Sequence, residues 1–450
     1  MPRPLQSLLV PVLCASTFLG LSGGYAGAAE PAPKPPPSWW DTVTLTGVFD
    51  GGVTWNGALP PDGLNFGQLF TDKANQPMLN QVALTLQRPL DPKATDYDFG
   101  FKVQFLYGSD ARYTQYLGEF GYAIDGRNQI ALQEAWGVIH FPLLFKGGFD
   151  IKAGQWVTLE GAETIDPTTN YFYTHSYIFQ FGTPFTETGV LAIAHVDPTV
   201  DLYLGLTGGE NTTIGYRAGD NNGAPAFVGG VGLNLLDGNL TILASTHIGP
   251  ETPDTLLARS ICFCNPNSAL TYLNDITVTW KVNDALSLIT DANYFRNDSI
   301  KSSGYGVAQY AIWTVLDWLK VVGRFEVWRD SGFNGGGAFV GAFPGNFDFI
   351  SAEWGFANSS FFEPPTTYLA LTAGLNITPP VPDGYFVKGI TFRPEIRFDT
   401  SLSGTTPFDG TSAPGGRVNA VGIPAFGIPP FGTGRSESQL TFGGDVLMKF

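Results

Sequence analysis

The most unusual side chains of this sequence lie in two segments, 318–329 and 386–399, where charged and apolar residues alternate. Neighbouring residues of a β-strand point to opposite faces, so each charged set shares one face of its strand. The two sets consist of Lys320, Arg324, Glu326, Arg393, Glu395, Arg397 and Asp399. Acids and bases at this spacing form ion pairs, and where their face borders water they set the field that a passing ion meets.

Two interpretations of these residues stay open. They line an aqueous pore as a charged ladder, or they form a paired network that stiffens the wall of the protein. If they line a pore, replacing Arg393 and Arg397 with Gln should move its ion preference toward cations.

Catalytic chemistry has few candidate residues. The histidines are His140, His175, His195 and His247. His175 precedes Ser176 and lies near Asp166, but adjacent residues of a strand point oppositely, and no serine stands in a nucleophile-elbow motif. The sequence also has no glycine-rich phosphate loop, Cys/His zinc pattern or EF-hand loop. We therefore expect that the protein is not an enzyme and binds neither a cofactor nor a metal ion.

The composition suits a protein with an apolar exterior and many turns. Charged residues make up 14% of the 450 residues, against about 25% in an average soluble domain. Aromatic residues also reach 14%, and the chain has 56 Gly and 33 Pro. Its formal net charge of −16 repels phosphate backbones, so we expect no nucleic-acid partner.

Period-two alternation runs through almost the whole chain and predicts sixteen strands. We place them at 42–56, 77–88, 96–108, 129–141, 149–159, 186–196, 199–207, 225–236, 239–249, 270–282, 285–297, 303–316, 318–329, 366–378, 386–399 and 437–450. Short and long connections alternate, with a break in this rule only near 298–302. This pattern is typical of a closed antiparallel transmembrane β-barrel with short periplasmic turns and long extracellular loops. Lipid favours closure, because an open sheet edge leaves backbone groups unpaired.

The beginning of the chain predicts export. Residues 1–28 have a basic Arg3, a mostly apolar stretch and the small-residue cleavage pattern Ala26-Gly27-Ala28, so we expect a signal peptide. Residues 29–41 predict a proline-rich periplasmic tether, and 42–450 predict the barrel. No later stretch of 18 residues is uninterruptedly apolar, so helical membrane spans are not expected. Cys262 and Cys264 are either a local disulfide or free thiols.

Two groups of aromatic residues have expected roles. Interfacial girdles are the expected place of Trp40, Trp136, Trp280, Trp313, Trp318 and Trp328. The long segment 160–185 contains Tyr171, Phe172, Tyr173, Tyr177 and Phe179. It either folds inward and narrows a pore or caps the outer end of the barrel.

The last strand ends on an aromatic residue. Phe450 shares a face with Met448 and Val446, while Lys449 and Asp445 lie opposite. A terminal aromatic residue on an alternating strand resembles the signal that the barrel assembly machinery recognises. We therefore expect Phe450 to act as an assembly signal.

Three segments resemble the OmpL-like family of outer-membrane β-barrel porins. They are KAGQWVTLEGAETIDPTTNYFYTHSYIFQFGTPFTETGV at 152–190, GRFEVWRDSG at 323–332 and RPEIRFD at 393–399. The resemblance implies a barrel in the bacterial outer membrane with pore activity, and it names no solute.

The combined patterns predict a porin-like channel for passive diffusion of small polar or ionic solutes. The alternative is a surface-exposed binding or adhesion barrel with a plugged lumen. The expected partners are outer-membrane lipids, the solutes and the barrel assembly machinery. The sequence leaves the formation of a homo-oligomer open.

Overall fold

The computed structural model describes residues 38–61, 63–91, 94–116, 119–120, 126–213, 222–252, 265, 267–299, 301–331, 365–410 and 434–450. The predicted signal peptide, residues 29–37 of the predicted tether, and Cys262 and Cys264 lie outside these residues. No helix in the described ranges has the length and apolarity to cross a membrane.

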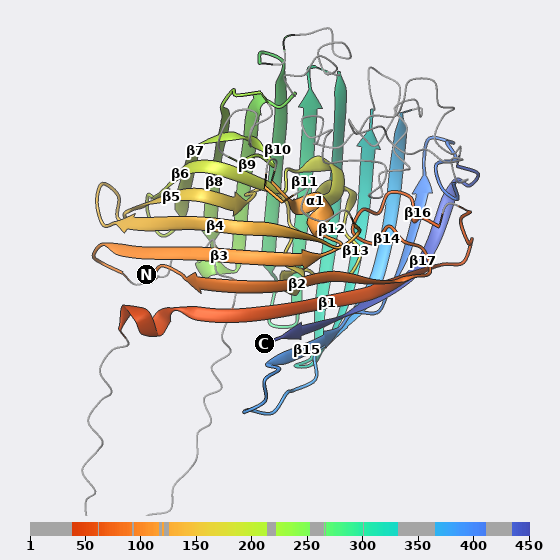
Figure 1. Cartoon of the computed structure of the whole chain (residues 1–450), viewed down its shortest axis with the longest axis horizontal. Coiled ribbons are helices and arrows are strands. Elements are labelled where there is room, and N and C mark those ends of the chain that lie inside the picture. Colours follow the sequence, from red (N-terminus) through yellow and green to blue (C-terminus); the bar gives the residue numbers. More distant parts are fainter. Residues whose placement is uncertain are drawn as a thin grey trace, which may run out of the picture.

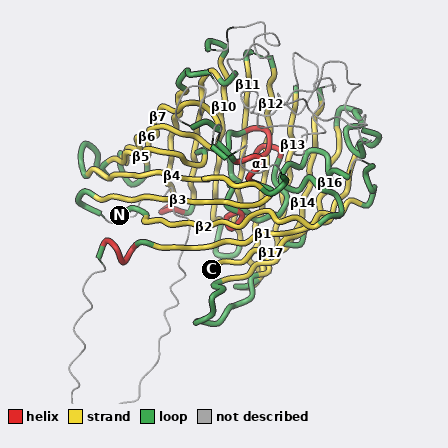
Figure 2. Tube along the Cα trace, in the orientation of Figure 1, coloured by secondary structure: helices red, strands yellow, loops and turns green. Residues whose placement is uncertain are grey.

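Nearly all regular structure in the described chain is β-strand (Figure 2). The strands are β1 (Thr44–Asn56), β2 (Pro77–Arg88), β3 (Asp98–Gly108), β4 (Gln129–Phe141), β5 (Phe149–Val157), β6 (Thr186–His195), β7 (Val200–Glu210), β8 (Ala226–Leu235), β9 (Leu240–Pro250), β10 (Leu270–Lys281), β11 (Leu286–Asn297), β12 (Ser302–Leu316), β13 (Leu319–Asp330), β14 (Thr366–Ile377), β15 (Gly389–Phe392), β16 (Glu395–Ser401) and β17 (Ser438–Lys449). The short helices are η1 (Trp39–Thr42), α1 (Ala111–Thr114), η2 (Pro167–Thr169), η3 (Ile178–Gly182) and η4 (Leu236–Gly238).

The strands form one closed antiparallel barrel. Each pairs with the next in the chain, except that β15 and β16 both pair with β14 and with β17, and β1 pairs with β17 from Val48↔Lys449 to Asn56↔Thr441. Beyond this ladder, Phe450 N donates to Gly47 O at 2.9 Å and Gly47 N donates to Phe450 O at 3.3 Å. In Figure 1 the C-terminus lies beside β1, and strands β1–β4 cross in front of β10–β14 at a steep angle. Strong tilt of this kind is what barrel closure requires.

The predicted strand 386–399 is divided into β15 and β16 by Arg393 and Pro394. Both strands lie between β14 and β17, and the register is continuous from Phe392↔Val446 to Glu395↔Gly443. Proline has no backbone N–H to donate to the ladder, which interrupts the pairing without shifting it. The seventeen strands therefore occupy sixteen positions around the barrel, as the alternation predicted.

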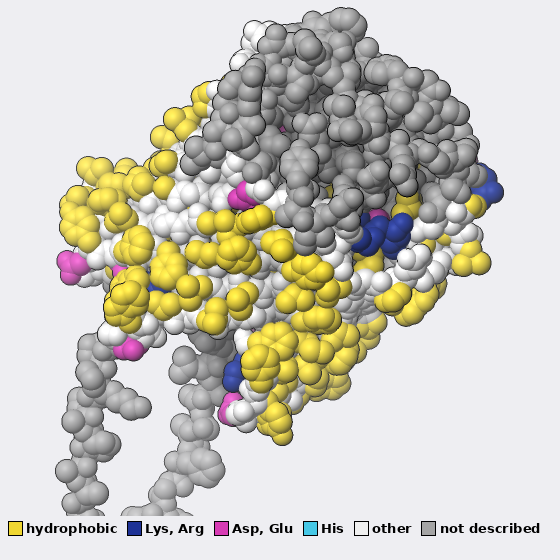
Figure 3. All heavy atoms as spheres, viewed as in Figure 1, with side chains coloured by type: hydrophobic (Ala, Val, Ile, Leu, Met, Phe, Trp, Pro, Cys, Tyr) yellow, Lys and Arg dark blue, Asp and Glu magenta, His cyan; other side chains and the backbone are white. Residues whose placement is uncertain are grey.

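The outer face of the barrel is apolar, and the alternation follows the predicted parity. On β13 and β16 the exposed side chains include Val321, Phe325, Ile396 and Phe398, while the charged residues between them are turned inward and buried. Hydrophobic side chains cover much of the visible barrel wall in Figure 3. Such a surface is stable against hydrocarbon and unfavourable against water.

Two of the six tryptophans expected in interfacial girdles face the lumen instead, so the girdle interpretation is wrong for them. Trp328 is buried and stacks on Phe295 with ring centroids 6.0 Å apart. Trp136 donates from Nε1 to Glu134 Oε2 at 2.6 Å. Both have the parity of the inward charged residues on their strands, and this parity overrides the general preference of Trp for the membrane interface. Trp40, Trp280, Trp313 and Trp318 are exposed.

The position of Phe450 generates the first prediction. Its backbone completes the pairing with β1, and its ring stacks on Phe386 with centroids 5.0 Å apart. We expect Phe450→Asp to slow membrane insertion severalfold, because a charge replaces the aromatic group at the closing seam. Heat-modifiable gel mobility followed over time in cells measures this rate. Phe386→Ala is the control, because it removes the ring contact and keeps the terminal residue; equal insertion rates for Phe450→Asp and the wild type would refute the role.

Candidate functional site: the lumen and its inward loop

The predicted charged ladder lies on one part of the inner wall. Residues 320, 324 and 326 are on β13, residue 393 precedes Pro394, and residues 395, 397 and 399 are on β16. All except Lys320 are buried. The structure thus brings six of the seven together beneath another part of the chain, and their role in lining a pore stays a prediction.

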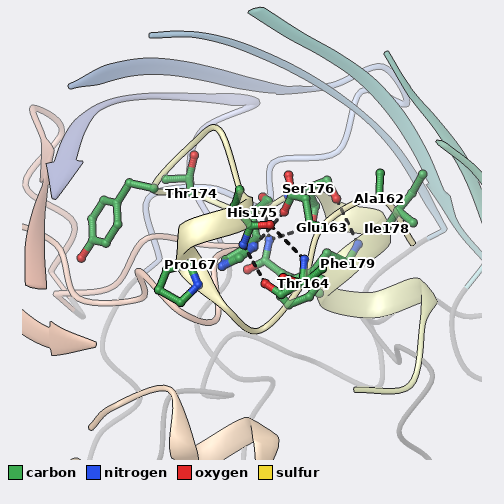
Figure 4. A network of polar contacts seen from close by, with 12 residues as sticks. Ala162, Glu163, Thr164, Pro167, Thr174, His175, Ser176, Ile178 and Phe179 are labelled. Atoms are coloured by element: carbon green, nitrogen blue, oxygen red, sulfur yellow. Dashed lines mark hydrogen bonds and ion pairs between the residues drawn. The ribbon is translucent and has the colours of Figure 1, made fainter. Parts of the chain in front are cut away.

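That covering segment is the loop between β5 and β6, residues 158–185. It folds into the lumen and not over the end of the barrel, so the inward alternative is the one observed. Its aromatic residues Phe172, Tyr173, Tyr177 and Phe179 are all buried. Figure 4 shows Glu163, His175 and Ser176 of this loop turned toward one another.

Glu163 is the centre of the contacts between the loop and the wall. Arg324 Nη1 and the Tyr310 hydroxyl donate to its Oε1 at 2.6 and 2.9 Å. Its Oε2 accepts from Ser176 N at 3.0 Å and lies 2.7 Å from Nδ1 of His175. One carboxylate therefore joins β12, β13 and two parts of the loop, in the charge-assisted geometry that gives strong hydrogen bonds.

The charge of Arg324 determines the protonation of Glu163. Burial by itself would raise the pKa of this carboxyl, but the guanidinium and the hydrogen bonds outweigh it and hold the pKa at about 2. Glu163 therefore stays ionised across the physiological range, and its attraction to Arg324 is retained there.

The acids of the ladder hold the loop by its backbone. Glu395 accepts from Tyr173 N at 2.8 Å and Thr174 N at 3.1 Å, and Glu326 accepts from Ile178 N at 2.9 Å. These N–H groups have no strand partner inside the lumen, so carboxylates satisfy donors that would otherwise be buried without a bond.

The arginines of the ladder hold loop carbonyls. Arg393 Nη1 donates to Pro167 O at 2.9 Å and Asn170 O at 2.8 Å, while its Nε bonds Asp445 at 2.9 Å. Arg397 Nη1 donates to His175 O at 2.5 Å. The planar guanidinium suits this role, because it can contact a carboxylate and a carbonyl in different directions at once.

A second inward segment packs on the first. Phe70, in the connection from β1 to β2, lies with its ring 5.5 Å from that of Phe179 and 5.4 Å from that of Phe185. Leu69 N donates to Gln180 Oε1 at 2.5 Å. Together with inward residues of β10–β14, these side chains form an apolar core inside the barrel. The two loops therefore stabilise each other through burial as well as through hydrogen bonds.

Lys320 differs from the other ladder residues. Its side chain is partly exposed, and within the described ranges no carboxylate lies at ion-pair distance from it. Its Nζ lies 5.5 Å from the ring centroid of Tyr171 in the loop. Of the seven predicted residues, Lys320 is thus the one that is not buried by the loop and the wall.

Comparison with known proteins agrees with this architecture. Residues 42–450 match the model of the family described as putative beta-barrel porin-2, OmpL-like. The chain belongs to this family. None of the curated proteins matches it.

Solved porin structures share the fold of this OmpL-like porin. The outer membrane channel DcaP of Acinetobacter baumannii is similar with a TM-score of 0.51 at 14% identity, over 91% of this chain and 97% of that one. The anion-selective porin from Comamonas acidovorans has a TM-score of 0.51 at 12% identity, over 91% and 99%. OmpT of Vibrio cholerae, in its trimer form, has a TM-score of 0.50 at 10% identity, over 91% and 99%. The family and this fold identify an outer-membrane porin of bacteria.

Sequence reasoning missed Glu163 as a functional residue of this porin. The only signal was indirect: the ladder has four bases and three acids, so a further acid had to come from elsewhere. Glu163 lies in the long loop, and no periodicity gives the direction of a loop side chain. Its partner could be found only in the folded chain.

Glu163→Gln tests the attachment of the loop. A carboxyl whose pKa is lowered on folding adds stability above its unfolded pKa, and this stability is lost as the pH falls through the folded value. For Glu163 the window runs from about 4.5 down to about 2. We expect the variant to lose roughly 3–5 kcal/mol of unfolding free energy at pH 7, because Arg324 is left buried without its partner. The difference from the wild type should shrink below pH 4.

Denaturant unfolding in detergent at several pH values measures this effect. Glu437→Gln, which neutralises an exposed carboxyl near the start of β17, is the matched control. A loss of stability at pH 7 that is equal in the two variants would contradict the central role of Glu163.

Proposed function

We propose that this porin is a passive channel for small polar or ionic solutes. The observation that carries the proposal is a closed barrel whose lumen is narrowed by an attached loop and still has ionisable side chains on its inner face, among them Lys320 and Lys102. A fixed loop limits the size of the solute, and charges in confined water are poorly screened and set its preferred sign. The likeness to a channel and an anion-selective porin supports this function.

The orientation that we propose places both chain ends in the periplasm. The connection 196–199 then faces the periplasm, and the end of the barrel from which the loop 158–185 enters faces the outside. Outer-membrane lipids surround the apolar wall, and the barrel assembly machinery inserts it. A homo-oligomer is also part of the proposal, since a similar porin has a trimer form.

The second candidate is a surface-binding barrel with a plugged lumen. The apolar core formed by the two inward loops favours it, because tightly packed aromatic rings exclude water. The two functions differ in whether any continuous aqueous path remains beside the loops.

Planar-bilayer recording separates the two candidates. We expect the purified full-length porin to give stepwise increases of conductance in potassium chloride. Insertion that is confirmed by protease protection but gives no steps would reject the channel in favour of the plugged barrel.

Lys320 generates the prediction on selectivity. Lys320→Gln should move the reversal potential in a salt gradient toward cation preference, because it removes a partly exposed and unpaired positive charge from the lumen. Lys388→Gln, at an exposed lysine outside the barrel wall, is the control. Equal reversal potentials for the two variants would mean that Lys320 does not face the ion path.

The double replacement of Arg393 and Arg397 with Gln should act differently. Both guanidinium groups are buried and hold loop carbonyls, so we expect the double variant mainly to change the size and noise of the conductance step. A pure shift of reversal potential with unchanged step size would instead favour the charged-ladder interpretation.

A further inference from the structure

Two lysines and a tryptophan meet on the inner face of β3, β4 and β5. Lys102 and Trp136 are opposite each other in the β3–β4 register, and Trp136 is opposite Gly154 in the β4–β5 register. The glycine places no side chain directly opposite the indole in this register. Lys152, two residues before Gly154 and on the same face, places its Nζ 4.3 Å from the ring centroid of Trp136.

The carboxylate of Glu134 lies within this group and is hydrogen-bonded to two of its members. Glu134 Oε1 accepts from Lys102 Nζ at 3.0 Å, and Glu134 Oε2 accepts from Trp136 Nε1 at 2.6 Å. Both oxygens of the carboxylate are thus engaged by groups other than Lys152. Glu134 therefore pairs with Lys102 and Trp136 and accepts no hydrogen bond from Lys152.

The ammonium of Lys152 has aromatic neighbours and no acceptor. Its side chain is 5% exposed, and the ring of Trp156 is its second aromatic neighbour, with the centroid 5.6 Å from Nζ. Within the described chain no oxygen accepts a hydrogen bond from Lys152. Aromatic rings offset part of the cost of removing an ammonium from water, but they supply no lone pair to its N–H groups.

An anion with a flat apolar body would satisfy each of these features. We propose that Lys152, Lys102 and Trp136 form a binding site for small aromatic carboxylates inside the lumen, an inference that rests on the channel function proposed above. The carboxylate accepts hydrogen bonds from the two ammonium groups, and the ring of the solute packs on the partly exposed indole of Trp136.

Block of ion current by benzoate tests the site. With the full-length porin in a planar bilayer, benzoate should reduce the potassium chloride current at concentrations about tenfold lower than benzamide, which has the same ring without the charge. Acetate, which has the charge without the ring, should also block more weakly than benzoate. A wild-type current without steps would reject the channel function, whereas steps that benzoate and benzamide reduce equally would reject the site alone.

Matched variants assign the block to the proposed residues. Lys152→Met keeps the apolar stem, removes the charge and should weaken benzoate block about tenfold. Lys281→Met removes an exposed charge at the end of β10 and should leave the block unchanged. Trp136→Leu should weaken the block by benzoate more than the block by acetate, because it removes the ring and keeps both lysines.

Two outcomes would overturn the site. One is equal block by benzoate in Lys152→Met and Lys281→Met, which would mean that benzoate does not bind to the ammonium of Lys152. The other is an equal loss for benzoate and acetate in Trp136→Leu, which would exclude ring recognition. Heat-modifiable gel mobility verifies the fold of each variant, and if Lys152→Met does not fold, Lys152→Gln with its retained polarity takes its place.

Discussion

The whole structure depends on one requirement, that every backbone N–H and C=O within the hydrocarbon must have a partner. An unpaired group there costs several kcal/mol, and an open sheet would expose a full row of them. The pairing of β1 with β17 removes both edges at once. Because this seam joins the first and last strands, the barrel wall is complete only when the entire chain from Thr44 to Lys449 is in place.

Closure of the barrel leaves a wide interior. The chain fills part of it with two of its own loops, and the loops bring backbone groups that have no strand beside them. Glu326 and Glu395 accept from loop N–H groups, and Arg393 and Arg397 donate to loop carbonyls. The arginines are buried in this way, whereas the inward residues Lys102 and Lys320 are partly exposed. At these positions the division follows the chemistry of the two side chains, since a guanidinium can satisfy several acceptors and an ammonium is more strongly hydrated. Lys152, which is buried beside Trp136 and Trp156, departs from it.

Much of the barrel could be predicted from the sequence. Strand positions follow from the alternation of apolar and polar residues, and closure of the sheet follows because lipid cannot hydrogen-bond the backbone groups of an open edge. The same parity placed Arg324 and Glu326 on the inner face correctly. It also indicates that Trp136 and Trp328 face inward, against the general preference of Trp for the membrane interface. The presence of Pro394 in the sequence also indicates that the strand 386–399 is interrupted. The partners of Glu163 were not, because a loop has no periodicity and its contacts are made with residues far along the chain.

These distant contacts determine when the loop can become fixed during folding. Glu163 precedes Arg324 by 161 residues, and Tyr173 precedes Glu395 by 222. The loop leaves the wall after β5, yet Arg324 and Glu395 are on β13 and β16, near the end of the chain. Contacts of such long range are slow to form, since chain closure must come before they add stability. The attachment of the loop to β13 and β16 can therefore form only after most of the wall strands have been synthesised, which makes it a late step of folding.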